Sequence, residues 1–157
     1  MTEAPRPRHV ERSGVLRLRL PLARAFPFLT PEGERLWVDG WDPEYLHPPG
    51  RPDPPPAGTV FRTGHGGEET FWLVLAFDAA AGAVDYVRVT PGSRLGTVSV
   101  RARDAGDGTT EAAVAYRLTA LSPEGQRKLE EMTPEGYDAM LRQWEDRIEA
   151  AAGLPRG

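Results

Sequence analysis

The chain of 157 residues has the length of a single domain, and its 39% hydrophobic and 27% charged residues are ordinary proportions for a globular protein. The formal net charge is −4 and no block of Lys or Arg occurs, which argues against a nucleic-acid partner. The absence of cysteine excludes disulfides and thiolate chemistry and fits a cytoplasmic location, and no apolar run of about 18 residues predicts a membrane span.

The first part of the chain predicts a leader, a strand and broken helices, in that order. Residues 1–11 are polar and are expected to form a flexible leader without the apolar run of a signal peptide. From Arg12 to Leu20 apolar and polar residues alternate, which indicates a strand with one buried face. Apolar residues then follow at helical spacing, but Pro27 and Pro31 interrupt the pattern, so short helices are expected.

The next segment, ERLWVDGWDPEYLHPPG, carries Trp37, Trp41 and Tyr45 within nine positions. Its glycines and prolines forbid a long helix, and the proline-rich loop 51–58 follows it. Large rings on such a segment can plug one end of the core. They can also form the wall or lid of a binding site, since each ring combines apolar area with one polar atom. Both interpretations stay open at this point.

Five further strands are expected at regular spacing, over residues 59–64, 69–78, 83–91, 97–104 and 110–121. Glycine-rich turns separate several of them, which is the pattern of an antiparallel meander. The strand at 69–78 is apolar on both faces, as expected for a central strand or for one that faces a cavity. Residues 133–153 then predict a long helix with one apolar stripe: Tyr137, Met140, Leu141, Trp144 and Ile148.

Three segments share the pattern [S/T]-P-E-G, beginning at Thr30, Ser122 and Thr133. In each, the hydroxyl can accept a hydrogen bond from a free backbone N–H, proline suits the first helical position, and glutamate favours the positive end of the helix dipole. The pattern therefore predicts three helix starts and is not a functional repeat.

The order of elements predicts an α+β domain: a curved six- to seven-stranded antiparallel sheet around a long C-terminal helix, with short broken helices after the first strand. One helix is narrower than a sheet of that width. The space between them must therefore hold bulky side chains, water or a ligand.

This layout resembles the START and birch-pollen-allergen superfamily, also called helix-grip or SRPBCC proteins, over residues 12–153. The run FPFLTPEGERLWVDGWDP is similar to the family's first-helix segment, and GTVFRTG, YVRVTPGSRLGTVSV and VAYRLTALSPEG resemble its successive strands. The resemblance implies a single helix-grip domain over 12–153, and the scarcity of Lys, Ile and Asn indicates a bacterial source. The superfamily includes lipid carriers, polyketide cyclases, hydroxylase domains and chaperone activators, so the fold does not select a function.

Ten residues are candidates for lining a cavity between the sheet and the helix. They are Phe26, Trp37, Trp41, Tyr45, Trp72, Tyr86, Arg88, Tyr116, Met140 and Trp144. Tyr116 shares a strand face with two apolar residues and is expected to point inward. Met140 and Trp144 suit either a solid core or a cavity wall.

The orientation of Tyr86 and Arg88 stays open, since both share a strand face with Val84. An inward Arg88 would need a carboxylate from the protein or from a ligand. An outward Arg88 would be an ordinary surface residue, and base rates for arginine favour that alternative.

The sequence contains little that points to catalysis or metal binding. No G-x-S-x-G motif occurs, and no convergent acid-base pair is visible. His65, Glu68 and Glu69 could fold around a metal ion, but a solvated hairpin tip explains GHGGEE better. No cofactor or metal is therefore expected.

We therefore expect a domain that binds an apolar or aromatic small molecule, or a lipid, in a cavity between the sheet and the C-terminal helix. The resemblance leaves two alternatives: an enzyme of the polyketide cyclase or dehydratase kind, and a protein-interaction domain like the activators of chaperone ATPases. The last alternative predicts an exposed apolar patch instead of a deep pocket. A protein partner is possible, but nothing in the sequence indicates one.

Overall fold

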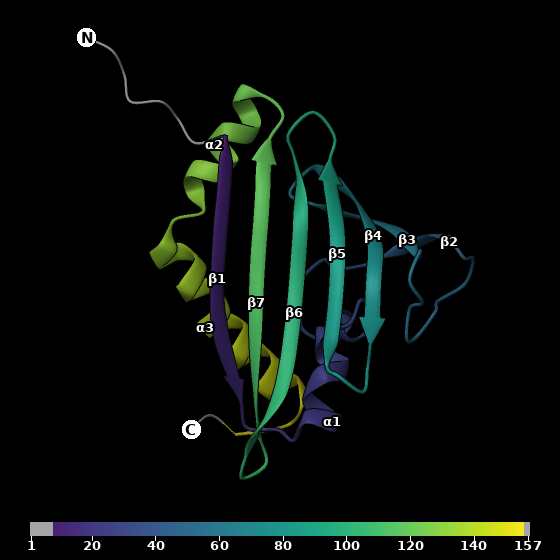
Figure 1. The fold of residues 1–157 in the computed structure, drawn as a ribbon, viewed down its shortest axis with the longest axis vertical. Coiled ribbons are helices and arrows are strands. Elements are labelled where there is room, and N and C mark those ends of the chain that lie inside the picture. Colours follow the sequence, from purple (N-terminus) through teal and green to yellow (C-terminus); the bar gives the residue numbers. More distant parts are fainter. Residues whose placement is uncertain (1–7, 156–157) are drawn as a thin grey trace.

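The structure, a computed structural model, describes residues 8–155 and contains one antiparallel sheet with a long helix lying across it (Figure 1). The strand order is β1-β7-β6-β5-β4-β3-β2. The strands are β1 His9–Leu18, β2 Glu44–His47, β3 Val60–His65, β4 Glu68–Asp78, β5 Ala83–Thr90, β6 Arg94–Gly106 and β7 Thr109–Ala120. The predicted α+β helix-grip fold with a curved sheet of six to seven strands is confirmed.

Short helices follow the first strand, and longer ones follow the last strand. They are α1 Leu22–Ala25, the 3₁₀ turns η1 Phe26–Leu29 and η2 Gly33–Leu36, α2 Pro123–Glu131 and α3 Pro134–Ala151. The prediction of short, broken helices between β1 and the aromatic segment is confirmed, and Pro27 lies at the start of η1. No helix within residues 8–155 has the length and apolarity needed to cross a membrane.

The first strand begins earlier than predicted. Residues 9–11, assigned from the sequence to the leader, pair with β7, and Val10 lies opposite Leu118. Val10 is buried with Leu118 and Leu129, whereas His9 and Glu11 point outward. The alternation of the strand therefore extends into a segment that looks polar overall. Residues 1–7 of the predicted leader lie outside the described residues.

The second strand was not predicted, because prolines flank it on both sides. Residues 44–47 form a short edge strand that pairs with β3, with Tyr45 opposite Phe61. An edge strand needs ladder hydrogen bonds on one side only, so prolines beside it are tolerated. The seventh strand therefore comes from the aromatic segment.

All three [S/T]-P-E-G segments form the hydrogen bond that their pattern predicts. The hydroxyl oxygen of Thr30 accepts from the N–H of Gly33 at 3.1 Å, Ser122 accepts from Gly125 at 3.1 Å, and Thr133 accepts from Gly136 at 3.0 Å. Ser122 is the N-cap of α2, and Thr133 is the N-cap of α3. The caps determine where both helices begin, and hence how α3 enters the space over the sheet.

Helix α3 lies close against β1 along one side. Leu141 is fully buried, and a Cβ added to Gly14 of β1 would lie 2.7 Å from its Cδ1. The hydroxyl of Tyr137 donates to the carbonyl of Val114 at 2.5 Å. Glu145 accepts a hydrogen bond from the backbone N–H of Arg17 at 2.6 Å. These contacts hold the helix over the β1–β7 side of the sheet and leave the β3–β6 side to other elements.

Candidate functional site

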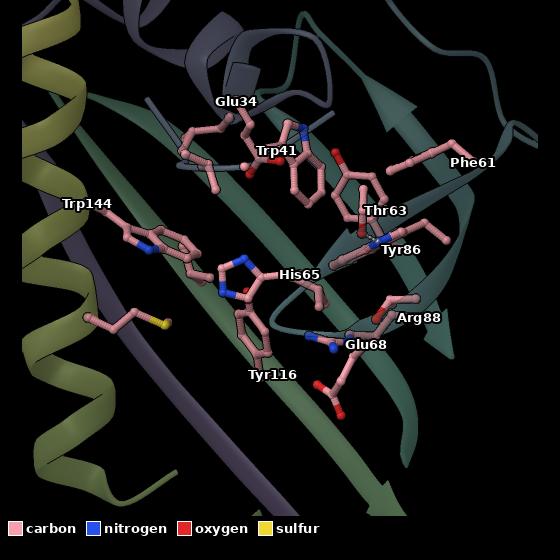
Figure 2. Close-up of a pocket in the computed structure, with 18 of the residues that line it drawn as sticks. Glu34, Trp41, Phe61, Thr63, His65, Glu68, Tyr86, Arg88, Tyr116 and Trp144 are labelled. Carbon is pink, nitrogen blue, oxygen red and sulfur yellow. Dashed lines mark hydrogen bonds between the residues drawn. The ribbon is translucent and has the colours of Figure 1, made fainter. Parts of the chain in front are cut away.

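A cavity of about 320 Å³ lies between the concave face of the sheet, helix α3 and the segment that follows η1 (Figure 2). Its walls come from residues 29–41, from strands β3 to β7 and from the inner side of α3. Four of its lining residues are exposed and mark the rim: Asp39, Gly40, Gly64 and His65. The volume is at the lower end of the range for sites that enclose small organic ligands.

The floor of the cavity changes character along the strands. Residues paired in register lie side by side, so their inward side chains form rows across the sheet. Ordered from the aliphatic to the polar end, the rows are Val84, Val100 and Val114; Tyr86, Val98 and Tyr116; Phe61, Trp72 and Arg88; and Thr63, Thr70 and Thr90. Val84 and Thr90 belong to these rows but do not line the cavity itself. The cavity is therefore aliphatic at one end and polar at the other.

One wall is a cluster of aromatic rings. Phe61 stacks on Trp72 with centroids 5.8 Å apart and an interplanar angle of 5°. Trp41 and Tyr86 each form a T-shaped contact with Trp72, with ring centroids 5.7 Å apart in both pairs. The indole N–H of Trp41 donates to the carbonyl of Pro31 at 2.8 Å, and that of Trp72 donates to Thr63 at 3.0 Å. Because both N–H groups are satisfied, the rings present apolar surface to the cavity.

Seven of the ten candidate residues line this cavity. They are Trp41, Trp72, Tyr86, Arg88, Tyr116, Met140 and Trp144. Trp144 and Met140 come from α3, and the others come from the loop after η2 and from strands β4, β5 and β7. Figure 2 shows Trp144 on the side of the helix and Tyr86 and Arg88 on the opposite side.

The structure places the other three candidates outside the cavity wall. Phe26 is buried and packs against Phe77, with ring centroids 5.7 Å apart. Trp37 is buried behind Trp144, at 5.5 Å, and its indole N–H donates to the carbonyl of Phe28 at 2.8 Å. It therefore supports the wall from behind and does not line it.

Tyr45 lies on the outer side of Phe61, at 5.6 Å, because it belongs to edge strand β2. Its hydroxyl donates to Glu32 at 2.7 Å, and Glu32 is also paired with Arg35 at 2.9 Å. Burial, together with the hydrogen bond to Glu32, raises the pKa of Tyr45. The aromatic segment thus divides between the two sequence interpretations: Trp41 lines the cavity, and Trp37 and Tyr45 pack behind it.

Arg88 points inward, against the expectation from base rates. Its Cζ lies 5.2 Å from the centre of the Trp72 ring, so the guanidinium gains a cation–π contact. Its only hydrogen bond to the described residues is a long one of 3.4 Å from Nη2 to Thr90, and its buried Nε has no partner there. Burial lowers the pKa of Arg88, and the neighbouring Arg94 acts in the same direction.

The nearby carboxylate of Glu68 is already paired. Both of its oxygens accept from Arg94, at 3.0 Å each, and both side chains are largely buried. This bidentate hydrogen bonding lowers the pKa of Glu68. Glu68 and Arg94 thus neutralise each other at the polar end of the cavity, and no described carboxylate forms an ion pair with Arg88.

Two tyrosine hydroxyls share the cavity. The hydroxyl of Tyr86 is buried without a hydrogen-bond partner among the described residues, and burial raises the pKa of Tyr86 well above its ordinary value. Burial raises the pKa of Tyr116 to about 12, although Arg88 acts to lower it. Both phenols therefore stay protonated near neutral pH and are available as donors.

Glu34 on η2 is a site residue that sequence reasoning missed. Its carboxyl group lines the cavity and makes no hydrogen bond or ion pair to the described residues, and burial raises its pKa well above the ordinary value of 4.5. Figure 2 shows Glu34 beside Trp41, on the side away from Arg88 and Glu68. The one available signal is spacing, because positions three apart share a face of a 3₁₀ turn and Trp37 was a candidate for the cavity wall.

His65 was expected at a solvated hairpin tip, and it is exposed beside the turn of Gly66 and Gly67. It also forms part of the cavity rim, and Figure 2 shows its ring between Trp144 and Tyr116. No group of three or more His, Asp or Glu within residues 8–155 is placed to hold a metal ion.

No protein-family model matches the chain, and no curated protein sequence matches it significantly. Solved structures do match. Ara h 8.0201 aligns over 90% of this chain and 99% of its own, with 13% identity and a TM-score of 0.63. The Zhui aromatase/cyclase from Streptomyces sp. R1128 aligns over 94% and 99%, with 16% identity and a TM-score of 0.63.

Norcoclaurine synthase from Thalictrum flavum, in complex with dopamine and hydroxybenzaldehyde, aligns over 95% of this chain and 89% of its own. Its identity to this chain is 12% and the TM-score is 0.64. At these identities the likeness concerns the fold, which is the helix-grip fold of the birch-pollen-allergen type. The expected fold resemblance is therefore confirmed.

Proposed function

We propose that the chain binds an apolar, aromatic small molecule in the cavity between the sheet and α3. The observation that carries the proposal is the wall formed by Trp41, Phe61, Trp72 and Trp144 around an unfilled volume of about 320 Å³. Rings of this kind offer large apolar area with few rotamers to immobilise, and burial of apolar ligand surface contributes about 25 cal/mol per Å² before ordering costs.

The proposal is supported by the distribution of the polar groups. Glu34, Tyr86, Arg88 and Tyr116 line the cavity beside its aromatic and aliphatic walls, and none of these side chains forms an ion pair with a described residue. A few convergent polar groups in an apolar pocket are typical of a site that orients a small ligand. The proposal keeps the cytoplasmic location expected from the sequence.

A titration with 2-naphthol, followed by calorimetry and by tryptophan fluorescence, tests the proposal. We expect saturable binding with one site per chain. Val98 lies between Tyr86 and Tyr116 in the floor, so Val98→Phe should fill the cavity and abolish binding. The matched control is Val89→Phe on the outer face of the same sheet, which should bind as the wild type does.

Overpacking alone destabilises a core by roughly 1–3 kcal/mol, so the thermal unfolding of both variants must be measured in parallel. The absence of saturable binding by the wild type would refute the proposal. Equal binding by the wild type and by a folded Val98→Phe variant would place the ligand elsewhere and refute it as well.

A second candidate function, an enzyme of the cyclase or dehydratase kind, is favoured by one observation. Glu34 is a carboxyl group in the cavity wall whose pKa is raised by burial, and a raised pKa favours the protonated form that a general acid needs. A test substrate is 4-hydroxy-4-phenyl-2-butanone, whose dehydration removes the hydroxyl and a proton from the carbon next to the carbonyl, as water, and forms a conjugated enone. Acceleration that Glu34→Gln abolishes and that Glu69→Gln retains would support catalysis; no acceleration by the wild type would argue against it for this substrate class.

A further inference from the structure

Arg88 lines the cavity without an ion-pair partner among residues 8–155, and this bears on the kind of ligand that the cavity can bind. We propose that the bound molecule is an aromatic monocarboxylate whose carboxylate group lies against Arg88. This inference rests on the proposed binding function and names its ligand class. It follows from the position of Arg88, from the carboxylates around it and from the order of the rows on the cavity floor.

The position of Arg88 leaves most of its hydrogen-bonding capacity unused. A guanidinium has five N–H groups, yet within the described part of the chain Arg88 donates one long hydrogen bond, to Thr90, and the Trp72 ring covers one face. A buried charge without a partner is costly, and a contact with an aromatic ring recovers only part of that cost. An anion from the ligand would supply the missing partner.

The carboxylates of residues 8–155 do not fill this role. Glu68 acts electrostatically on Arg88, but both of its oxygens are occupied by Arg94. Glu34 lies on the other side of the cavity beside Trp41, where burial favours its neutral form. The Glu68–Arg94 pair is neutral as a unit, and Asp39 at the rim pairs with Arg147 at 3.2 Å. Arg88 therefore lines the cavity as a positive charge without an ion-pair partner among the described residues.

That charge count selects the kind of anion. One carboxylate would neutralise one guanidinium, and the planar shapes of the two groups match in a pair of parallel hydrogen bonds. A phosphate dianion would leave a second negative charge uncompensated in an apolar cavity, which is costly. The phenol of Tyr116, whose pKa responds to Arg88, is a neighbouring donor for the same group.

The rows of side chains on the cavity floor indicate how the rest of the ligand lies. Arg88 lies in the third row, beside Trp72, and the aliphatic row of Val84, Val100 and Val114 lies two rows away. Inward positions along one strand are about 7 Å apart, so a ring system of one or two rings extends from the guanidinium over the tyrosine row. The apolar end of the ligand would then contact the aliphatic row.

The test compares 2-naphthoate, 2-naphthamide and 2-naphthyl phosphate by calorimetry on the wild-type chain. The three probes share the same rings and differ in the charge of one substituent. We expect 2-naphthoate to bind at least about tenfold more tightly than the amide, and more tightly than the phosphate. Equal binding of naphthoate and amide would overturn the inference and leave the proposed function intact; tighter binding of the phosphate would also overturn it.

The variant Arg88→Gln removes the charge and keeps a polar side chain. We expect it to lose the preference for 2-naphthoate while its affinity for the amide changes by less than about threefold. The matched control is Arg101→Gln, since Arg101 is half-exposed and pairs with Asp85 across the outer face at 2.8 Å. Retention of the preference in Arg88→Gln would overturn the inference. Failure of all three probes to bind the wild type would refute both the inference and the proposed function.

Discussion

Helix α3 has two apolar sides that meet different surroundings. Tyr137, Leu141 and Ile148 are buried against the β1–β7 side of the sheet, where Gly14 lets the backbones approach closely. Met140 and Trp144 are only partly buried and face the cavity. The first side stabilises the fold, and the second leaves apolar surface free for a ligand. The difference shows that an apolar residue on a helix serves packing or binding according to what lies opposite it.

The largest expected effect is a difference in stability loss between truncations on the two sides of α3. Leu141→Ala removes a fully buried side chain and should lower the free energy of unfolding by about 2–5 kcal/mol. Met140→Ala removes a side chain that borders an unfilled volume, and it should cost about 1 kcal/mol. Urea denaturation of both variants measures the difference. Equal losses would show that the two sides are packed alike.

The second prediction uses ligand-linked stability. A ligand at 100 times its Kd should raise the free energy of unfolding by about 2.7 kcal/mol. With 2-naphthol at one fixed concentration, the wild type and Leu141→Ala should gain similar increments, whereas Trp144→Ala should gain clearly less, because Trp144 lines the cavity. Thermal unfolding with and without the probe gives these increments. A full increment in Trp144→Ala would remove this residue from the binding wall.

A smaller effect concerns the pH dependence of folding stability that Glu34, in the cavity wall, contributes. The pKa of Glu34 is higher in the folded chain than the ordinary value of 4.5. At any pH between the unfolded-state pKa and the folded-state pKa, folding is therefore accompanied by uptake of a proton. The wild type should therefore lose stability as the pH rises through that interval, and Glu34→Gln should not. Each unit of pKa elevation corresponds to about 1.4 kcal/mol.

Chemical denaturation of both chains at several values between about pH 4 and about pH 8 measures this difference. The stability of Glu34→Gln relative to the wild type should increase with pH. Parallel pH profiles for the two chains would show that Glu34 is solvated as an ordinary surface carboxylate.

The smallest expected effect acts on both sides of α3 together. Thr133→Ala removes the N-cap hydrogen bond to Gly136 and should cost about 1 kcal/mol of stability. Because the cap lies outside the cavity, the affinity for 2-naphthol should stay within about twofold of the wild type. A large loss of affinity with this small loss of stability would show that the start of the helix determines the shape of the cavity.

Much of the fold could be predicted, because strand alternation and helix caps are local patterns. The meander, the broken helices and the start of α3 at Thr133 all follow from residues adjacent in sequence. Strand β2 was missed because its pairing with β3 depends on a partner distant in the chain. Helical spacing placed Leu141 and Trp144 on one stripe, but it could not reveal that one meets a strand and the other an unfilled volume.

The site could be predicted only in part. Strand alternation indicated that Tyr86 and Arg88 share a face, yet choosing the inner face required the pairing of Arg88 with Trp72 on the neighbouring strand. Tyr45 and Trp37 were expected at the cavity because of their ring size, but hydrogen bonds to Glu32 and Phe28 hold them behind its wall. Glu34 carries no sequence motif, and its significance comes from its surroundings.

The order of the strands and of α3 along the chain has a consequence for biosynthesis. Strand β1 pairs with β7, and residues 134–151, which cover the concave face, follow all seven strands. During translation, the inner side of β1, where Gly14 meets Leu141, is therefore made well before its cover, and closure needs contacts between distant parts of the chain, which slows folding. Until α3 has been made, the inner face of the sheet is exposed and apolar. Binding of a chaperone or of a small molecule to that face would then reduce aggregation of the nascent chain.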